Sequence, residues 1–348
     1  MNMLIHVRCL AALLIALTVI SCQRGSEELK LPVKTVAMKS PVADHSTASL
    51  PVTKSGKFIF QTTDAGNTWQ DISEGLPLNV QGGRLFFSGQ HVILNAENGL
   101  FHTAINSPSP VWKEDIVHDQ EIPYIYPGLT GLYGYNPATG FFKEMQGSGI
   151  WMPLGNTFDG KVVNDIVETT DGTIVIASHS GIFKSMDGCK TWKEVFGDTW
   201  VSDLIDADGL MYAGGAYGLL RSTDRGEHWE MIKRDMGDAY QLTTIDGGLV
   251  AIFTGEPSAS KGSKSQVMVS YDKGMTWQSI DQNLHAGKYI YDFEQAGDYL
   301  FCSKDTGVYR SADKGNTWEF VRPAKDKERV ELAVSGKTVY AVLSWGGC

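Results

Sequence analysis

The segment Ser311-Ala312-Asp313-Lys314-Gly315-Asn316-Thr317-Trp318 is the strongest indication of the fold, because its pattern S/T-x-D-x-G-x-x-W recurs along the chain. Residues 62–69, 222–229 and 270–277 match the pattern fully, and residues 185–192 match it except that Cys189 replaces the glycine. We call these five segments the boxes. A short apolar strand with a leading glycine precedes a box, as in residues 181–185, 218–222 and 307–311, and a strand led by the tryptophan follows it. Repeats of this length predict an array of similar structural units.

Each box has the composition of a tight turn anchored by an aromatic ring. The Ser or Thr and the Asp can hydrogen-bond to the turn backbone, and the glycine permits a positive φ. The tryptophan is a large apolar anchor for the hairpin. We therefore expect structural roles for the box residues Asp64, Trp69, Asp187, Trp192, Asp224, Trp229, Asp272, Trp277, Asp313 and Trp318.

Two further strands precede the third strand of a repeat, for example residues 201–205 and 210–213. Four short strands make one blade of an all-β propeller with antiparallel blades. The box aspartates from Asp187 to Asp313 are 37, 48 and 41 residues apart, and 123 residues separate Asp64 from Asp187. Two degenerate units fit that gap, with third strands predicted at residues 99–103 and 131–135. The total is a single seven-bladed β-propeller, with six blades left open because the second degenerate unit is short.

The two ends of the chain complement each other. The first box has only one short strand before it, at residues 57–61, whereas the chain finishes with two strands, at 330–334 and 338–343. We expect these N- and C-terminal strands to join in one blade, which closes the ring and leaves no bare strand edge.

The boxes resemble the Asp-box, or BNR repeat, of sialidases, sortilin-like domains, xyloglucanases and photosystem assembly factors. This resemblance implies that the boxes lie between strands three and four, and that ligands bind on the opposite face. Sialidase chemistry is not expected, because the Arg-Ile-Pro motif is missing and Val321-Arg322-Pro323 is the nearest string. Xyloglucanases of this type hold substrate between two propellers, whereas one is expected here.

Residues 1–21 have a positive Arg8 and an apolar run, which is typical of an export signal. The sequence Val19-Ile20-Ser21-Cys22 resembles the bacterial lipobox, which implies cleavage before Cys22 and its lipidation. The alternative is an ordinary secretory signal. Residues 22–55 are rich in Ser, Thr, Lys and Pro and are predicted to be a flexible tether, followed by the propeller at 56–348. We thus expect a lipid-anchored protein of the bacterial cell envelope, at the outer membrane, on a side that the sequence leaves open.

The net charge and the cysteines limit the partners, cofactors and disulfides that we expect. A net charge of −10 argues against nucleic acid, whose phosphates need a basic surface. No zinc-ligand spacing occurs, so neither a metal nor a cofactor is expected. One disulfide could form among Cys189, Cys302 and Cys348, but the sequence does not choose a pair. We expect a monomer that meets the membrane through its lipid and binds a protein or polysaccharide partner.

Two sets of residues recur at positions of the expected ligand face. Carboxylates stand near the start of the first strands, with Gln241 at the same place in another blade: Asp165, Asp203, Asp292 and Glu331. They could bind a cation or act as the acid and base of glycoside hydrolysis, or they could accept backbone N–H groups of the next blade. Aromatic and imidazole side chains precede third or first strands: His179, Trp200, Tyr217, Tyr289 and Trp345. They suit sugar stacking or protein binding, or else packing between blades.

A propeller fold alone does not select a function. Without an enzymatic motif, the sequence favours a non-catalytic binding or scaffold lipoprotein that recognises a protein or glycan through the face opposite the boxes. The alternative is a glycoside hydrolase-like enzyme that uses the ring of carboxylates.

Overall fold

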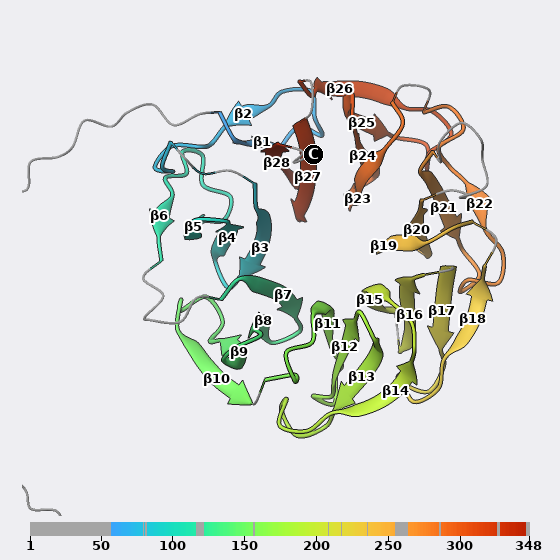
Figure 1. Cartoon of the computed structure of the whole chain (residues 1–348). Coiled ribbons are helices and arrows are strands. Elements are labelled where there is room, and N and C mark those ends of the chain that lie inside the picture. The colour runs from blue at the N-terminus through green and yellow to red at the C-terminus, as the bar shows by residue number, and fades with distance from the viewer. Residues whose placement is uncertain are drawn as a thin grey trace, which may run out of the picture. The chain divides into compact units, whose positions relative to one another are not determined.

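The computed structural model describes residues 57–345 apart from positions 79, 81, 116–121, 156, 208, 217, 235, 255–263, 285–286 and 326–327. These residues belong to one compact unit, Val52–Cys348. They form seven four-stranded antiparallel sheets, arranged as blades around a central channel (Figure 1). The prediction of an all-β, seven-bladed propeller is confirmed. None of the described ranges contains a helix that could span a membrane, and the predicted lipidation site Cys22 lies outside them.

The strands follow one another blade by blade, from the channel outward. Blade 1 contains β3 (Arg84–Ser88), β4 (His91–Ala96), β5 (Gly99–Ala104) and β6 (Lys113–Glu114). Blade 2 contains β7 (Tyr124–Gly128), β8 (Gly131–Asn136), β9 (Gly140–Glu144) and β10 (Trp151–Gly155). Blade 3 contains β11 (Val163–Glu168), β12 (Ile174–Ser178), β13 (Gly181–Ser185) and β14 (Lys193–Gly197).

The remaining blades repeat this order until the ring closes. Blade 4 contains β15 (Val201–Ala207), β16 (Leu210–Gly215), β17 (Gly218–Ser222) and β18 (Glu230–Lys233). Blade 5 contains β19 (Ala239–Ile245), β20 (Gly248–Phe253), β21 (Gln266–Ser270) and β22 (Gln278–Ser279). Blade 6 contains β23 (Ile290–Ala296), β24 (Tyr299–Lys304), β25 (Gly307–Ser311) and β26 (Glu319–Pro323).

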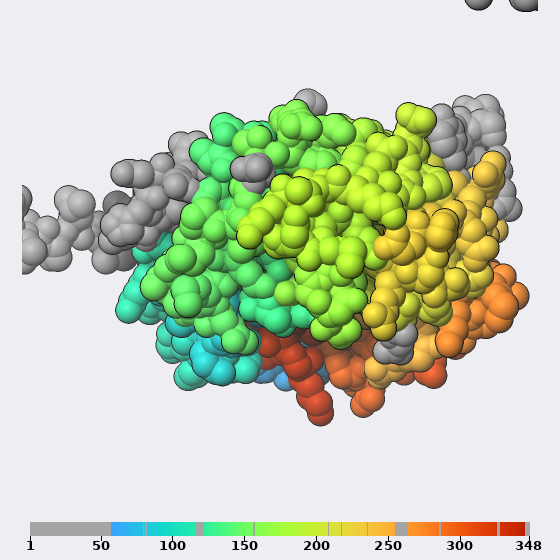
Figure 2. All heavy atoms as spheres, turned by 90° about the horizontal axis from the view of Figure 1, so that it is seen from below, coloured from blue at the N-terminus to red at the C-terminus, as the bar shows by residue number. Residues whose placement is uncertain are grey.

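Blade 7 joins the two ends of the chain, as predicted. Its order is β2 (Gln70–Asp71), β1 (Ile59–Thr62), β28 (Thr338–Trp345) and β27 (Glu328–Ser335). β1 pairs with β28 from Ile59↔Val342 to Thr62↔Val339, and Leu343 donates its N–H to the Phe58 carbonyl at 2.9 Å. Seen from the side, the blades follow one another around the rim from cyan to orange (Figure 2). The ring is therefore closed by hydrogen bonds between strands from opposite ends of the sequence.

The boxes form the turns between third and fourth strands. In the box of blade 6, the Ser311 hydroxyl accepts the Gly315 N–H at 2.8 Å and donates to Asp313 at 2.8 Å. Thr317 donates both its N–H and its hydroxyl to the same carboxylate, at 2.8 and 2.6 Å. The corresponding threonine bond, to Thr68, lowers the pKa of Asp64 to about 2. The boxes are thus turns in which the hydroxyl of the serine or threonine and the aspartate carboxylate are engaged by hydrogen bonds within the turn.

The box that lacks the glycine lies against a glycine of the preceding blade. A Cβ at Gly274 would lie 2.8 Å from the Ile232 side chain, so this box position packs tightly against β18. In blade 3 the position holds Cys189, which is fully buried at a φ of 67°. Gly155 of β10 faces it, and a Cβ there would lie 2.2 Å from the Cys189 carbonyl oxygen. A side chain at position 155 would therefore collide with the backbone of this box.

Blade 2 corrects one detail of the predicted repeat. Residues 131–135 were expected to form a third strand, but they belong to β8, the second strand. The third strand is β9, and its last residue Glu144 takes the position of the box serine. The Glu144 carboxylate accepts the N–H groups of Gly147 and Gly149, each at 3.0 Å, and the Ser88 hydroxyl at 2.6 Å. Trp151 follows Glu144 by seven residues, as Trp318 follows Ser311, so the turn survives without its aspartate.

Two of the three cysteines considered for a disulfide are free and fully buried. Cys189 lies in the box of blade 3 and Cys302 in β24 of blade 6. Burial raises the pKa of the Cys189 thiol to about 12. Both side chains therefore act as small core residues, and Cys348 lies outside the described residues.

Candidate functional site

One register position of the first strand can be followed through all seven blades. In blade 3 this position is Asp165, which pairs with Ala177 of the second strand. The next residue of that strand, Ser178, pairs with Gly181, the first residue of the third strand. The same criterion selects Arg84 in blade 1, opposite Asn95, and Tyr124 in blade 2, opposite Tyr135. We call the seven equivalent residues the ring positions: Arg84, Tyr124, Asp165, Asp203, Gln241, Asp292 and Glu331.

Three ring carboxylates tie their blade to the next one. Asp165 accepts the Leu204 N–H at 2.9 Å. Asp203 accepts the Leu242 N–H, and Asp292 accepts the Leu332 N–H at 2.7 Å. Gln241, in the blade between, donates its side-chain amide to Asp292. Ring positions of blades 3 to 6 therefore act as clamps between successive blades.

A β-bulge places each clamp. The register of the first and second strands shifts just before Asp165, Asp203, Gln241 and Asp292. The extra residue gains a link of its own in three of these blades. Asn164 donates to the Val201 carbonyl, Ser202 to the Ala239 carbonyl at 2.9 Å, and Tyr240 to the Ile290 carbonyl at 2.7 Å. The bulge thus turns two adjacent side chains toward the next blade.

Three of the candidate catalytic residues are clamps whose carboxylate oxygens are already hydrogen-bonded. Burial in the channel wall raises the pKa of Asp165, Asp203 and Asp292. Each also accepts the N–H of the residue that follows it, so both carboxylate oxygens are engaged. Their hydrogen bonds give these residues the blade-to-blade role that the sequence offered as the alternative to catalysis.

The ring positions of the three remaining blades make no such link. Glu331, Arg84 and Tyr124 belong to blades 7, 1 and 2, which are consecutive around the ring. Their first strands pair with the second strands without a register shift. Among the described residues, none of the three side chains has a hydrogen-bond or ion-pair partner. We call these three residues the open arc.

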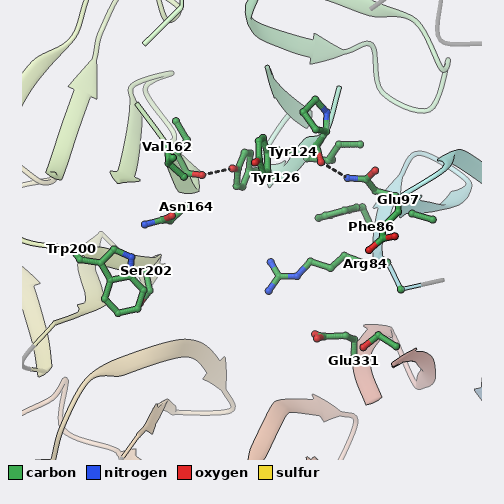
Figure 3. A pocket seen from close by; sticks show the side chains of 18 residues that line it. Arg84, Phe86, Glu97, Tyr124, Tyr126, Val162, Asn164, Trp200, Ser202 and Glu331 are labelled. Atoms are coloured by element: carbon green, nitrogen blue, oxygen red, sulfur yellow. Dashed lines mark hydrogen bonds between the residues drawn. The ribbon is translucent and has the colours of Figure 1, made fainter. Parts of the chain in front are cut away.

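The open arc lines a cavity of about 560 Å³ at the mouth of the channel. Figure 3 shows Arg84 projecting into it, with Glu331 on one side and Tyr124 and Trp200 at its edges. The Tyr124 side chain is 43% exposed, and Trp200 is half-buried. A channel cavity of about 650 Å³ shares Arg84 and Glu331 with it. None of the four ring positions of blades 3 to 6 lines the mouth cavity.

Charges in this cavity are close enough to influence one another. Burial lowers the pKa of Arg84, but Glu331, Asp292 and the other ring carboxylates raise it by more, so Arg84 is a permanent cation. Burial and the nearby Asp292 raise the pKa of Glu331 to about 7. Glu97, an exposed carboxylate, also lines the cavity. The site therefore offers one fixed cation, one carboxyl that titrates near neutral pH, and exposed aromatic rings.

The predicted ligand-binding residues do not all meet there. Trp200 lines the cavity, and so does Glu331 from the predicted carboxylate set. His179 is exposed in the turn between β12 and β13, and Tyr289, 47% exposed, precedes β23 with the Lys288 ammonium 4.9 Å from its ring centroid. Neither lines the cavity. Tyr217 lies outside the described residues, and only the backbone of Trp345 is described, paired with Glu328 at the end of β28.

Sequence reasoning missed Arg84 and Tyr124. Both lie in blades whose boxes are degenerate, so their first strands could not be aligned with those of the other blades. The sequence did contain a signal for Arg84, because a positively charged residue stands at a position where four other blades have a carboxylate. In the part of the chain that the structure describes, no group of His, Cys, Asp and Glu is arranged to hold a metal ion.

No family model matches the chain. It is similar to xyloglucanase Xgh74A of Acetivibrio thermocellus, with 26% identity over 166 residues that cover 34% of this chain and 19% of that protein. Among solved structures it resembles the GH74 xyloglucanase from Xanthomonas campestris, with a TM-score of 0.53, 13% identity and coverage of 77% of this chain and 52% of that one.

It also resembles the extracellular domain of a putative hybrid two component system from B. thetaiotaomicron, with a TM-score of 0.54 and 12% identity, over 82% of this chain and 42% of that one. At these identities the structural matches are evidence for the propeller fold alone. The chain spans 19% of the length of the curated relative and 52% and 42% of these two solved chains.

Proposed function

We propose that this protein binds a glycan, without cleaving it, in the mouth cavity bordered by the open arc. The observation that carries the proposal is the division of the ring. Four ring positions hold neighbouring blades together, and the three that do not are consecutive and line one cavity. Side chains released from a repeated structural task, and gathered at one cavity, are those expected to serve a ligand.

The composition of the cavity supports a sugar ligand. Sugar rings stack on exposed aromatic faces, which Tyr124 and Trp200 supply. Their hydroxyls need hydrogen-bonding groups, and Arg84, Glu331 and Glu97 line the same cavity. Such a cavity, with a few polar groups among aromatic walls, is typical of small-ligand sites. The similarity to two xyloglucanases is consistent with this proposal.

Binding without cleavage is favoured because most ring carboxylates are already engaged. Glycoside hydrolysis needs two carboxyl groups with free oxygens on either side of the scissile bond. Asp165, Asp203 and Asp292 are each engaged by backbone N–H groups. The alternative enzyme is a glycosidase in which Glu331 is the acid, an assignment favoured by its pKa of about 7 and its place in the cavity.

The proposed setting is the bacterial envelope. Cys22 would carry the lipid, residues 22–55 would tether the propeller, and the protein would act as a monomer at the outer membrane. An acidic chain of net charge −10 suits a glycan partner better than a nucleic acid. Loss of membrane partition in Cys22→Ala, measured by detergent phase separation, is the expected result, and unchanged partition would contradict lipidation.

The test of the proposal is a binding screen of the full chain against neutral and acidic plant and bacterial polysaccharides. We expect at least one to bind, and Trp200→Ala and Tyr124→Ala to weaken that binding by roughly 10-fold or more. Tyr289→Ala is the matched control, since this aromatic side chain is exposed but lies outside the cavity. It should bind as the wild type does.

The same incubations distinguish binding from hydrolysis. Reducing sugar released by the wild type, and lost in Glu331→Gln, would replace the binding proposal by the glycosidase. If no polysaccharide binds, or if Trp200→Ala and Tyr124→Ala bind as tightly as the wild type, the mouth cavity is not a glycan site.

A further inference from the structure

We infer that Arg84 makes the mouth cavity selective for glycans that carry a carboxylate, and uronic acid residues are the class tested below. This inference rests on the proposed function and names the class of sugar that the site takes. Three observations support it: Arg84 occupies a ring position, the N–H donors of the Arg84 guanidinium are free within the described ranges, and the Arg84 side chain projects into the cavity.

Arg84 cannot perform the task of its structural equivalents. A clamp at this position accepts a backbone N–H, as Asp165 does from Leu204 at 2.9 Å. A guanidinium has five N–H donors and no acceptor, so it cannot take that role. Blade 1 therefore replaces a structural acceptor by a donor, and the first strand there also lacks the bulge that places the clamps.

The donors of Arg84 are unused within the part of the protein that the structure describes. Its side chain is exposed to the cavity and makes no hydrogen bond or ion pair there, whereas Arg221 and Arg310 bind Glu230 and Glu319. Figure 3 shows the guanidinium end of Arg84 in the open space between Glu331 and Trp200. Two parallel N–H groups of a guanidinium match two oxygens of a carboxylate, the anionic group of acidic sugars.

The negative charge of three neighbouring carboxylates is weakened by hydrogen bonds or by protonation. Asp165 and Asp292 each accept backbone N–H groups from two residues, which disperses their charge. Glu331 is the acid of the open arc, and a pKa of about 7 leaves about half of the molecules without charge there at neutral pH. A protonated Glu331 would also be a donor to the ligand. Tyr124 and Trp200 supply the stacking surface for the sugar ring that carries the carboxylate.

The experiment compares acidic glycans with their own neutral forms. The probes are oligosaccharides of polygalacturonate, alginate, hyaluronan and glucuronoxylan, each beside its carboxyl-reduced counterpart, titrated calorimetrically into the full chain. We expect at least one acidic probe to bind roughly 10- to 100-fold more tightly than its reduced form. Arg84→Gln should reduce that ratio to near one, and Arg84→Lys should keep part of it, because the charge remains but the paired donors are lost.

Arg221→Gln is the control, since Arg221 is paired with Glu230 and does not line the cavity. It should leave the ratio of affinities unchanged. Equal binding of acidic and reduced probes, or a ratio that survives Arg84→Gln in a folded variant, would overturn the inference. If reduced probes still bind and Trp200→Ala abolishes that binding, the glycan proposal stands and only the selectivity is wrong. If no probe of either kind binds, both proposals fail.

Discussion

The carboxylate of Asp165 in blade 3 accepts the backbone N–H of Leu204 in blade 4, at a distance of 2.9 Å. Removal of this acceptor leaves the N–H of the buried Leu204 with one remaining partner, the Asp203 carboxylate at 3.0 Å. We expect Asp165→Ala to lower the free energy of unfolding by about 1–3 kcal/mol. Denaturant unfolding checks this value, and Glu331→Ala, in the open arc, should not lower the free energy of unfolding at neutral pH. Equal losses would mean that the ring positions do not divide into clamps and an open arc.

Glu331 should make stability depend on pH near neutrality. Its pKa rises from a usual value of 4.5 to about 7 in the folded protein, so the folded state binds this proton more tightly than the unfolded chain does. Stability is therefore highest below about pH 4.5 for this group and falls as the pH rises toward 7, by up to about 3 kcal/mol.

Unfolding of Glu331→Gln between pH 5 and 8 isolates this contribution. The variant should lose part of the decline, and the remainder should include Glu294, whose pKa burial and Asp292 raise to about 8. A wild type and a variant with parallel pH profiles would show that Glu331 titrates normally.

The contact between Gly155 and Cys189 predicts a steric effect in the outer strands. A Cβ at Gly155 would lie 2.2 Å from the Cys189 carbonyl oxygen, so Gly155→Ala must push β10 away from the box of blade 3. We expect a loss of about 1–3 kcal/mol in thermal or denaturant unfolding.

Gly160→Ala is the control for this prediction, because no atom lies within 4 Å of its Cβ position. Its positive φ of 69° should cost about 1–2 kcal/mol without any change in packing. Adding Cys189→Gly to Gly155→Ala should restore little of the lost stability, since the clash involves the Cys189 backbone. Full recovery of stability in the double variant would show that the Cys189 side chain causes the clash instead.

Closure through blade 7 predicts that the C-terminal strand supports the whole ring. Deletion of residues 336–348 removes β28, which pairs with both β1 and β27. We expect loss of the single cooperative unfolding transition, followed by circular dichroism, and rapid proteolysis in all blades. Cleavage confined to residues near β1 and β27, with an unchanged melting temperature, would show that the other six blades are stable as an open ring.

The sequence predicted the fold because the box is a local signal. Its serine or threonine, aspartate and glycine interact within eight residues, so the motif survives in five blades and gives their number and order. Glu144 shows where this reasoning fails. It replaces the box serine in blade 2 and binds Gly147, Gly149 and Ser88. Because the box pattern is missing there, the glycine-led strand β8 was interpreted as the third strand.

The candidate site was less predictable because it depends on contacts between blades. The repeated carboxylates were visible in the sequence, but their partners, such as the N–H of Leu332 for Asp292, lie about 40 residues away. Trp200 was selected as an exposed aromatic and does line the cavity. Arg84 was missed because its importance comes from being the exception at its ring position, which requires the register of all seven first strands.

We expect the ligand to bind at the open arc and not at the boxes. Hydrogen exchange of the full chain, with and without a glycan identified by the binding screen, distinguishes these two locations. We predict slower exchange in the first strands of blades 7, 1 and 2, around Glu331, Arg84 and Tyr124, and at Trp200, with no change in the boxes. Protection confined to the boxes, or to the first strands of blades 3 to 6, would contradict the account.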